Sequence, residues 1–318
     1  GTLLFVSACV GCSLSTIVEE LMVYRFVQAV GACVGPTLAR AVARDVFGPT
    51  RAARALSLIA MLMALAPAVA PTLGGILLLW LPWPTIFIFL GLYGLTMIAL
   101  IQLFLAESLP QRQSMHPVAI SRNYALLVRD PVFLIATFAS GMIYAGLLTY
   151  LSSSSFVYID MLGVPVEYFG FIFLTSVAGY MLGSAVSARL TRNLESEQTV
   201  LLGVLLATVA VSLMLVGATL LPENIWVLIL PMVFYATGMG LILPNAMAVA
   251  LRGYPHMAGT ASALLGFIQM GLSASATALV GLFLKTTPVP MLYSMFVITV
   301  LALVLSVLLH RSRAATRH

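Results

Sequence analysis

Residues 21–45 read LMVYRFVQAVGACVGPTLARAVARD. This stretch is mostly apolar, with one cation, Arg25, near its start and two more, Arg40 and Arg44, near its end. A helix rises about 1.5 Å per residue, so roughly 20 such residues cross about 30 Å of hydrocarbon. Similar stretches follow one another along the chain, which is 61% hydrophobic and only 8% charged. We therefore predict an all-α protein, a polytopic transmembrane helical bundle.

Polar breaks and prolines between the apolar runs define the predicted spans. The prediction is a partial first span over roughly 1–14 and about nine full spans after it. The full spans are expected at 17–43, 53–80, 84–106, 131–155, 165–190, 198–221, 224–250, 257–284 and 288–310.

Arginines mark one side of the membrane. Of the 15 Lys and Arg residues, all except Arg25 and Lys285 fall in alternate loops or in the C-terminal tail. Cytoplasmic loops carry this excess of cations, so we expect the C-terminus in the cytoplasm. The cations are spread along that face, and nucleic-acid binding is not expected.

The polar stretch 107–130 divides the chain. Pro36 and Arg44 before it recur at equal spacing as Pro244 and Arg252 after it, which predicts two parallel six-helix halves. The predicted parts are the remainder of an N-terminal bundle (its helices three to six) in 1–106, a central cytoplasmic loop in 107–130, and a C-terminal bundle with a short basic tail in 131–318. The first apolar run is short and opens on Gly1, so we expect preceding spans to be missing.

Charges inside hydrocarbon are costly, which makes Arg25 the leading candidate for function. Gln28 lies on the same helical face. Arg25 is either a buried cation that faces a cavity or a side chain that extends to the lipid headgroups. Pro67, Pro71, Gly74 and Gly75 predict either a permanently kinked packing helix or a hinge between moving halves.

Four uncharged polar residues within the spans are candidates for the lining of a substrate cavity: Tyr144, Tyr150, Asn245 and Gln269. Such groups either bond across helices or line an apolar cavity that suits lipophilic solutes. Cys9, Cys12 and Cys33 are predicted to be small packing residues. The chain has no phosphate-binding loop, paired metal-ligand motif or nucleophile motif, so no catalytic residue, metal or cofactor is expected, and the protein is not expected to be an enzyme.

Several of these segments resemble one family. RFVQAVGACVGPTLARAVARDVF (25–47) resembles the fourth-helix Arg–Gln–Gly motif of major facilitator drug:proton antiporters, and ALAPAVAPTLGG (64–75) resembles their fifth-helix antiporter motif. GMGLILPNAMAVAL (238–251) and AGTASALLGFIQMGLSA (258–274) closely resemble the tenth and eleventh helices of the Bcr/CflA subfamily of drug resistance transporters. The similarity extends over essentially the whole chain.

The resemblance implies secondary active efflux of amphipathic drugs across the bacterial inner membrane by proton antiport and alternating access. The implied partners are lipophilic small molecules, protons and the bilayer, and the implied state is a monomer. Arg25 with Gln28 takes the proton-coupling position, and Pro67, Pro71, Gly74 and Gly75 take the position of the antiporter hinge. The alternative is a carrier for a metabolite such as a sugar or an amino acid. The family's first two helices are absent, and the coupling acid with them, so we expect this chain alone not to transport.

Overall fold

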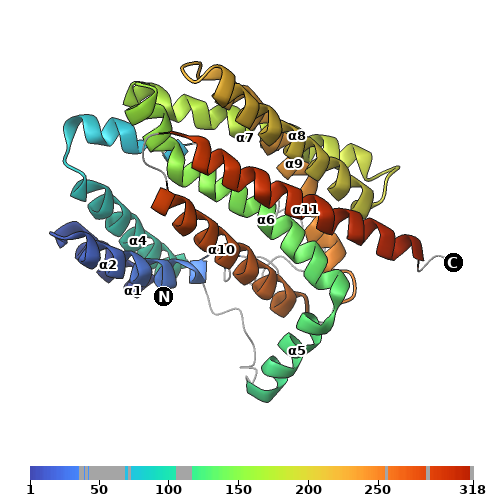
Figure 1. Ribbon diagram of the computed structural model, residues 1–318. Coiled ribbons are helices and arrows are strands. Elements are labelled where there is room, and N and C mark those ends of the chain that lie inside the picture. Colours follow the sequence, from blue (N-terminus) through green and yellow to red (C-terminus); the bar gives the residue numbers. More distant parts are fainter. Residues whose placement is uncertain are drawn as a thin grey trace. The chain divides into compact units, whose positions relative to one another are not determined.

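The computed structural model describes residues 1–35, 39, 42, 69–70, 73–104, 117–254, 257–283 and 287–315 (Figure 1). Within these residues every regular element is a helix. The chain divides into two compact units, residues 1–114 and 115–318. Most of the span predicted at 53–80, with Pro67 and Pro71, lies outside the described residues.

The first unit includes the helices α1 (Thr2–Leu14), α2 (Val18–Ala32) and α4 (Pro84–Phe104), and a helical segment at residues 73–80. Helix α1 packs against both α2 and α4. Glycines permit this approach: a Cβ at Gly31 of α2 would stand 2.5 Å from the Phe5 amide nitrogen, and one at Gly94 of α4 would stand 2.7 Å from Val6. Burial of apolar surface gives little driving force for helix association in lipid, which is itself apolar. Helices there associate through close packing, and small residues permit it.

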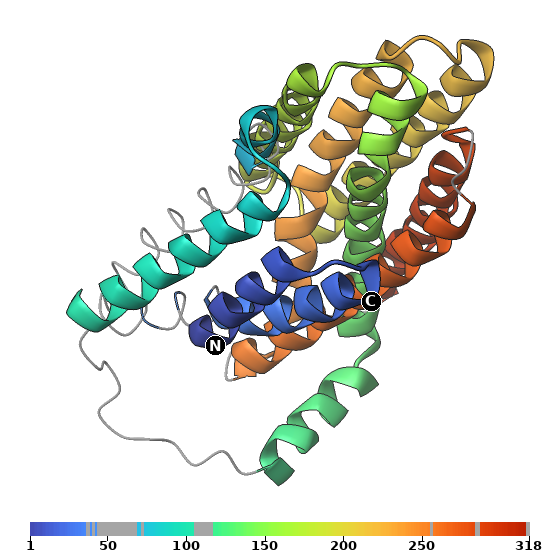
Figure 2. The same ribbon diagram turned by 90° about the vertical axis from the view of Figure 1, so that its left-hand side faces the viewer.

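The second unit is a bundle of longer helices. Its elements are α5 (Pro117–Arg129), α6 (Pro131–Ser155), the π-helix η1 (Phe156–Met161), α7 (Val166–Leu190), α8 (Ser196–Leu220), α9 (Trp226–Leu251), α10 (Ala258–Phe283) and α11 (Val289–Ala315). Helix α6 packs against α9, α10 and α11, and the two views show α6 beside α10 and α11 (Figures 1 and 2).

The predicted membrane class is confirmed at the level of the helices. Among the described residues, seven helices are long and apolar enough to span a bilayer, and α1 is a shorter apolar helix. Their bounds agree with the predicted spans from 84 onward within a few residues. Nine full spans are predicted. Two of them, at 17–43 and 53–80, are only partly described, so the count of nine stays a prediction.

The core of the second unit lies where α6, α8, α9 and α11 meet. Met214, Met232, Tyr235 and Met291 are all 0% exposed in it. Tyr235 also donates from its hydroxyl to the Ile143 carbonyl at 2.6 Å. Large apolar side chains on the outer faces, such as Leu213 at 59% exposure, suit contact with lipid chains.

Helices α7 and α9 meet backbone to backbone. A Cβ at Gly179 of α7 would stand 2.5 Å from the Val233 carbonyl oxygen, and one at Gly240 of α9 would stand 2.6 Å from the Ser184 amide nitrogen. A Cβ at Gly183 would collide with the Thr237 carbonyl oxygen. These glycines form a small-xxx-small contact, the arrangement that lets transmembrane helices approach most closely.

An amphipathic helix, α5, occupies part of the stretch predicted as a polar connection. Leu127 on α5 is 0% exposed, whereas Arg122 is exposed. Helix α6 then starts at Pro131 and is capped by Asp130, whose carboxylate accepts a hydrogen bond from the Val132 amide at 2.8 Å. This cap and proline explain the break between α5 and α6.

Candidate functional site

Arg25 lies in the middle of α2 and is held within the first unit. Its guanidinium donates to the Gln28 side-chain oxygen at 2.6 Å, and its central carbon lies 5.8 Å from the centre of the Phe87 ring of α4. Arginine over an aromatic face gains a cation–π attraction. Arg25 itself remains exposed, whereas Gln28 is only 3% exposed.

Gln28 connects this arginine to a third helix. Its side-chain nitrogen donates to the sulfur of Cys9 on α1 at 2.9 Å. The predicted pair Arg25 and Gln28 is therefore brought together, and the structure adds Cys9 and Phe87 to it. Cys9 stands in an apolar helix without a polar neighbour in sequence, and Phe87 stands in a charge-free span, so no local pattern distinguishes either from a packing residue.

In the second unit, Gln269 and Tyr144 lie on facing helices. Gln269 of α10 donates to the Ser140 hydroxyl of α6 at 3.3 Å. Tyr144 follows Ser140 by one helical turn and so lies on the same face of α6. Gly141 leaves room for this contact, because a Cβ there would stand 3.0 Å from Leu272 and 3.5 Å from Gln269.

Tyr150 and Asn245 lie inside the second unit. Tyr150 is 1% exposed, and its hydroxyl is 2.8 Å from that of Tyr158 in η1. Asn245 is 4% exposed and donates both to the Ser187 hydroxyl at 2.7 Å and to the Leu241 carbonyl at 2.8 Å. Both side chains therefore satisfy their polar groups by bonding within the bundle.

Of the predicted hinge motif, Gly74 and Gly75 are described and Pro67 and Pro71 are not. Both glycines lie in a helical segment, residues 73–80. Among the described residues, no atom outside its own helical segment lies within 4 Å of a Cβ built at Gly74.

Two polar contacts lie beyond the predicted site residues, at the α9–α10 turn and the starts of α6 and α8. Arg252 donates to both Glu197 carboxylate oxygens, at 2.8 and 3.5 Å. Tyr254 donates to the Asp130 carboxylate at 2.8 Å. Partial burial, with this hydrogen bond to a carboxylate, raises the pKa of the Tyr254 hydroxyl to about 12.

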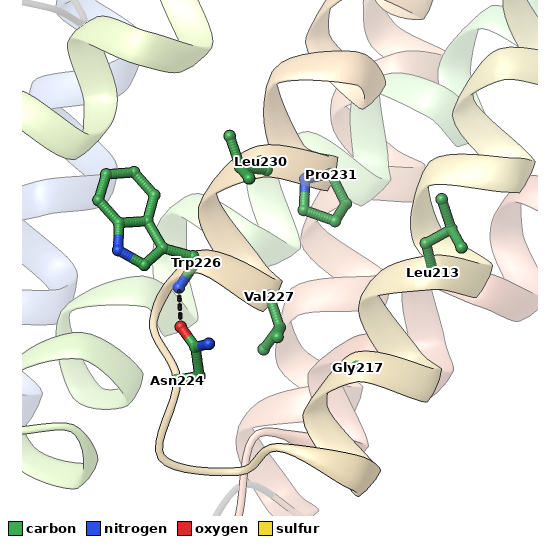
Figure 3. Close-up of a pocket in the computed structure, with 7 residues that line it drawn as sticks. All are labelled: Leu213, Gly217, Asn224, Trp226, Val227, Leu230 and Pro231. Atoms are coloured by element: carbon green, nitrogen blue, oxygen red, sulfur yellow. Dashed lines mark hydrogen bonds between the residues drawn. The ribbon is translucent and has the colours of Figure 1, made fainter.

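Two shallow hollows of the described surface lie at the opposite end of α9. Figure 3 shows one of about 360 Å³, lined by Leu213, Gly217, Asn224, Trp226, Val227, Leu230 and Pro231. The Asn224 side-chain oxygen accepts from the Trp226 amide at 3.0 Å. None of the predicted site residues lines this hollow. Trp226 at a tight turn between two spans suits an interfacial anchor.

The described residues have the composition of membrane-spanning helices. The described part holds no group of three His, Cys, Asp or Glu side chains that would bind a metal ion. Its polar residues lie within apolar helices, where they bond to a carbonyl of the preceding turn, as Ser306 does, or to a neighbouring helix, as Gln269 does. Together with seven candidate spans, this arrangement defines a polytopic helical membrane protein.

Comparison with known proteins assigns the family. The family model described as Major Facilitator Superfamily matches residues 1–278. The chain is 32% identical over 303 residues to the uncharacterized MFS-type transporter YdgK of Bacillus subtilis, covering 94% of this chain and 75% of that protein. It is also 32% identical over 285 residues to a bicyclomycin resistance protein homolog of Haemophilus influenzae, covering 87% of this chain and 71% of that one.

The fold agrees with this assignment. The structure superposes on a bacterial homolog of the human lysosomal transporter Spinster, in an inward-facing and unoccupied conformation, with a TM-score of 0.71. The two are 16% identical, and the match covers 98% of this chain and 81% of the other. This protein belongs to the Major Facilitator Superfamily: it is a membrane transporter and not an enzyme. The bicyclomycin resistance homolog agrees with the resemblance to the Bcr/CflA subfamily.

Proposed function

We propose that this protein exports amphipathic small molecules across the bacterial inner membrane in exchange for protons. Two bundles would expose a central site to each side in turn. The bicyclomycin resistance protein homolog among its relatives supports this substrate class.

We propose the full topology that the charge pattern predicts. It has about nine full spans after a partial first one, a cytoplasmic connection over 107–130 between the bundles 1–106 and 131–318, and a cytoplasmic C-terminus. The working unit is a monomer. The division of the chain into compact units at residues 114 and 115 is compatible with these boundaries.

The observation that carries the proton-coupling proposal is Arg25, an arginine kept within an apolar helix and bonded to a buried amide. A guanidinium stays charged at any physiological pH, so it does not itself release the transported proton. It acts as a constant positive charge that favours the ionised form of an acid facing it. In the described residues no carboxylate pairs with Arg25, which leaves the identity of that acid to the proposal's test.

Substrate contact is proposed for the face formed by Tyr144 and Gln269. Both are only partly exposed, and each presents a polar group beside apolar surface. Such a surface suits an amphipathic solute, which needs much apolar contact and a few hydrogen bonds. Tyr150 and Asn245 would contribute indirectly, because their hydrogen bonds stabilise the packing of the helices on which they lie. Pro67, Pro71, Gly74 and Gly75 would form the hinge that lets one bundle rock against the other.

The test is drug efflux by the product of the complete gene, in cells and in vesicles with an imposed pH gradient. Arg25→Ala should lower the pH-driven efflux rate by roughly tenfold or more, because a charge-assisted hydrogen bond and a constant cation are lost together. Arg25→Lys should recover part of the rate, since lysine keeps the charge but not the planar donor geometry. Arg122→Ala, an exposed arginine on α5, is the matched control and should keep the parental rate.

Normal efflux by Arg25→Ala would remove this residue from proton coupling. Efflux that is independent of the pH gradient would contradict antiport. Uptake or export of a sugar or an amino acid, without drug efflux, would favour the metabolite carrier instead.

A further inference from the structure

The sulfur of Cys9 completes a chain of hydrogen bonds that ends at Arg25. Arg25 of α2 donates to the Gln28 side-chain oxygen at 2.6 Å, and the Gln28 side-chain nitrogen donates to Cys9 of α1 at 2.9 Å. Cys9 is 1% exposed and Gln28 is 3% exposed. The bond between Gln28 and Cys9 is therefore buried within the first unit, whereas the bond between Gln28 and the exposed Arg25 is only partly buried.

The direction of each bond follows from the chemistry of the groups. A guanidinium has only donors, so the amide oxygen of Gln28 must face Arg25. The amide NH₂ must then face Cys9, and the thiol sulfur must act as the acceptor. An amide turned by half a rotation would present its NH₂ to the guanidinium, and two donors would then meet.

Helix α4 encloses the same group of residues. The Phe87 ring lies beneath the Arg25 guanidinium at 5.8 Å. One turn later on α4, a Cβ at Gly91 would stand 3.4 Å from the Cys9 Cβ, which is ordinary van der Waals contact. Cys9 thus has α4 on one side and the Gln28 amide on the other, and its side chain has little freedom to move.

We propose that Cys9 is a positioning residue for proton-coupled transport, which orients the Gln28 amide so that its oxygen holds Arg25. This inference rests on the function proposed above for Arg25. Cys9 bonds to Gln28, which in turn bonds to Arg25, so Cys9 acts through Gln28. The residue requirement is for a small acceptor at position 9, which cysteine and serine meet and alanine and valine do not.

Cys12 provides an internal control. It lies one turn further along α1, is 0% exposed, and makes no hydrogen bond to Gln28. The Cys12 thiol also lies near Arg25, so a change at Cys12 alters the packing around the same arginine but leaves the acceptor at position 9 in place. A change at Cys9 that acts only by packing should therefore resemble the same change at Cys12.

The experiment measures pH-driven drug efflux by the complete gene product in vesicles, together with its thermal unfolding in detergent. Cys9→Ala should lower the efflux rate about 3- to 10-fold, the range expected for one lost hydrogen bond. Cys9→Ser should stay within about twofold of the parental rate, since it keeps an acceptor. Cys12→Ala should also stay close to parental, and Cys9→Val should repeat the loss if Cys9→Ala folds poorly.

A double substitution separates positioning from packing. In a chain that already carries Gln28→Ala, adding Cys9→Ala should cause no further loss of efflux, because the intermediary is gone. The same two positions should show coupled, non-additive effects on thermal unfolding, a readout that needs no transport activity.

Three results would overturn the inference: parental efflux by Cys9→Ala, equal losses for the alanine changes at Cys9 and Cys12, or fully additive losses with Gln28→Ala. Failure of the proposed function would give a different result, because Arg25→Ala would then show a normal efflux rate. If Arg25→Ala is inactive while Cys9→Ala is normal, only the role of Cys9 is refuted.

Discussion

At the scale of single residues, several polar groups in this protein bond to partners that lie on other helices. Gln28 bonds to Cys9 across 19 positions of sequence, and Gln269 bonds to Ser140 across 129. An unsatisfied polar group in hydrocarbon costs free energy, so each span that carries such a group favours a particular neighbour. The same requirement explains why Asn245 and Tyr150, both deeply buried, have hydrogen-bond partners within the second unit.

Tyr254 gives a prediction about pH at this scale. Its pKa is raised from about 10 to about 12, so the folded state holds this proton more tightly than the unfolded state does. The stabilisation should be complete below pH 10 and decline as the pH rises from 10 to 12. Tyr254→Phe should cost about 1.5 kcal/mol of unfolding free energy at neutral pH, because a hydrogen bond to a carboxylate is lost.

The measurement is the difference in thermal unfolding between the parental protein and Tyr254→Phe, in detergent, from pH 7 upward. The difference should be constant to about pH 10 and then shrink. Tyr168→Phe, at an exposed position of α7, is the control and should have little effect. A difference that grows above pH 10 would contradict the assigned sign.

At the scale of elements, close helix packing depends on positions where only glycine fits. Helices α7 and α9 meet at Gly179, Gly183 and Gly240, where a Cβ would run into the backbone of the other helix. The apolar effect that drives helix packing in water is weak in lipid, so this intimate contact has to supply the association. Gly266 on α10 is different, since no described atom lies within 4 Å of a Cβ built there.

Gly183→Ala should therefore destabilise the protein by about 2 kcal/mol, the usual cost of forcing extra atoms into a packed contact. Gly266→Ala, the matched change in a helix with free space, should be neutral or slightly stabilising, since alanine favours the helix. Thermal unfolding in detergent and the yield of folded protein measure both effects. Equal stability of the two variants would show that α7 and α9 can separate without cost.

At the scale of the whole molecule, the arginine pattern predicts which side of the membrane each turn occupies. Arg122 lies on α5, in the connection expected to be cytoplasmic, and Asn224 lies in the turn between α8 and α9, expected on the outside. Translocation of cationic loops is disfavoured, so these assignments follow from loop charge alone.

Cysteine labelling tests this topology. In a background with Cys33 replaced by alanine, Arg122→Cys should react with a membrane-impermeant reagent only from the cytoplasmic side, and Asn224→Cys only from the outside. Cys9 and Cys12 are buried and should contribute little background. Labelling of position 122 from the outside would invert the proposed orientation and with it the direction of transport.

The sequence by itself determined the class of protein, the limits of most described helices and the candidate status of Arg25. A span must satisfy its own backbone within hydrocarbon, so its length and composition alone reveal it. Helix α5 is less evident, because its amphipathic face needs a neighbouring bundle to bury Leu127. Only the tertiary structure decided which side chains meet: Gln28 with Cys9, Tyr150 with Tyr158, and Asn245 with Ser187. Helix periodicity indicates the face on which a residue lies, but the helix that covers this face is selected by close packing between distant parts of the chain.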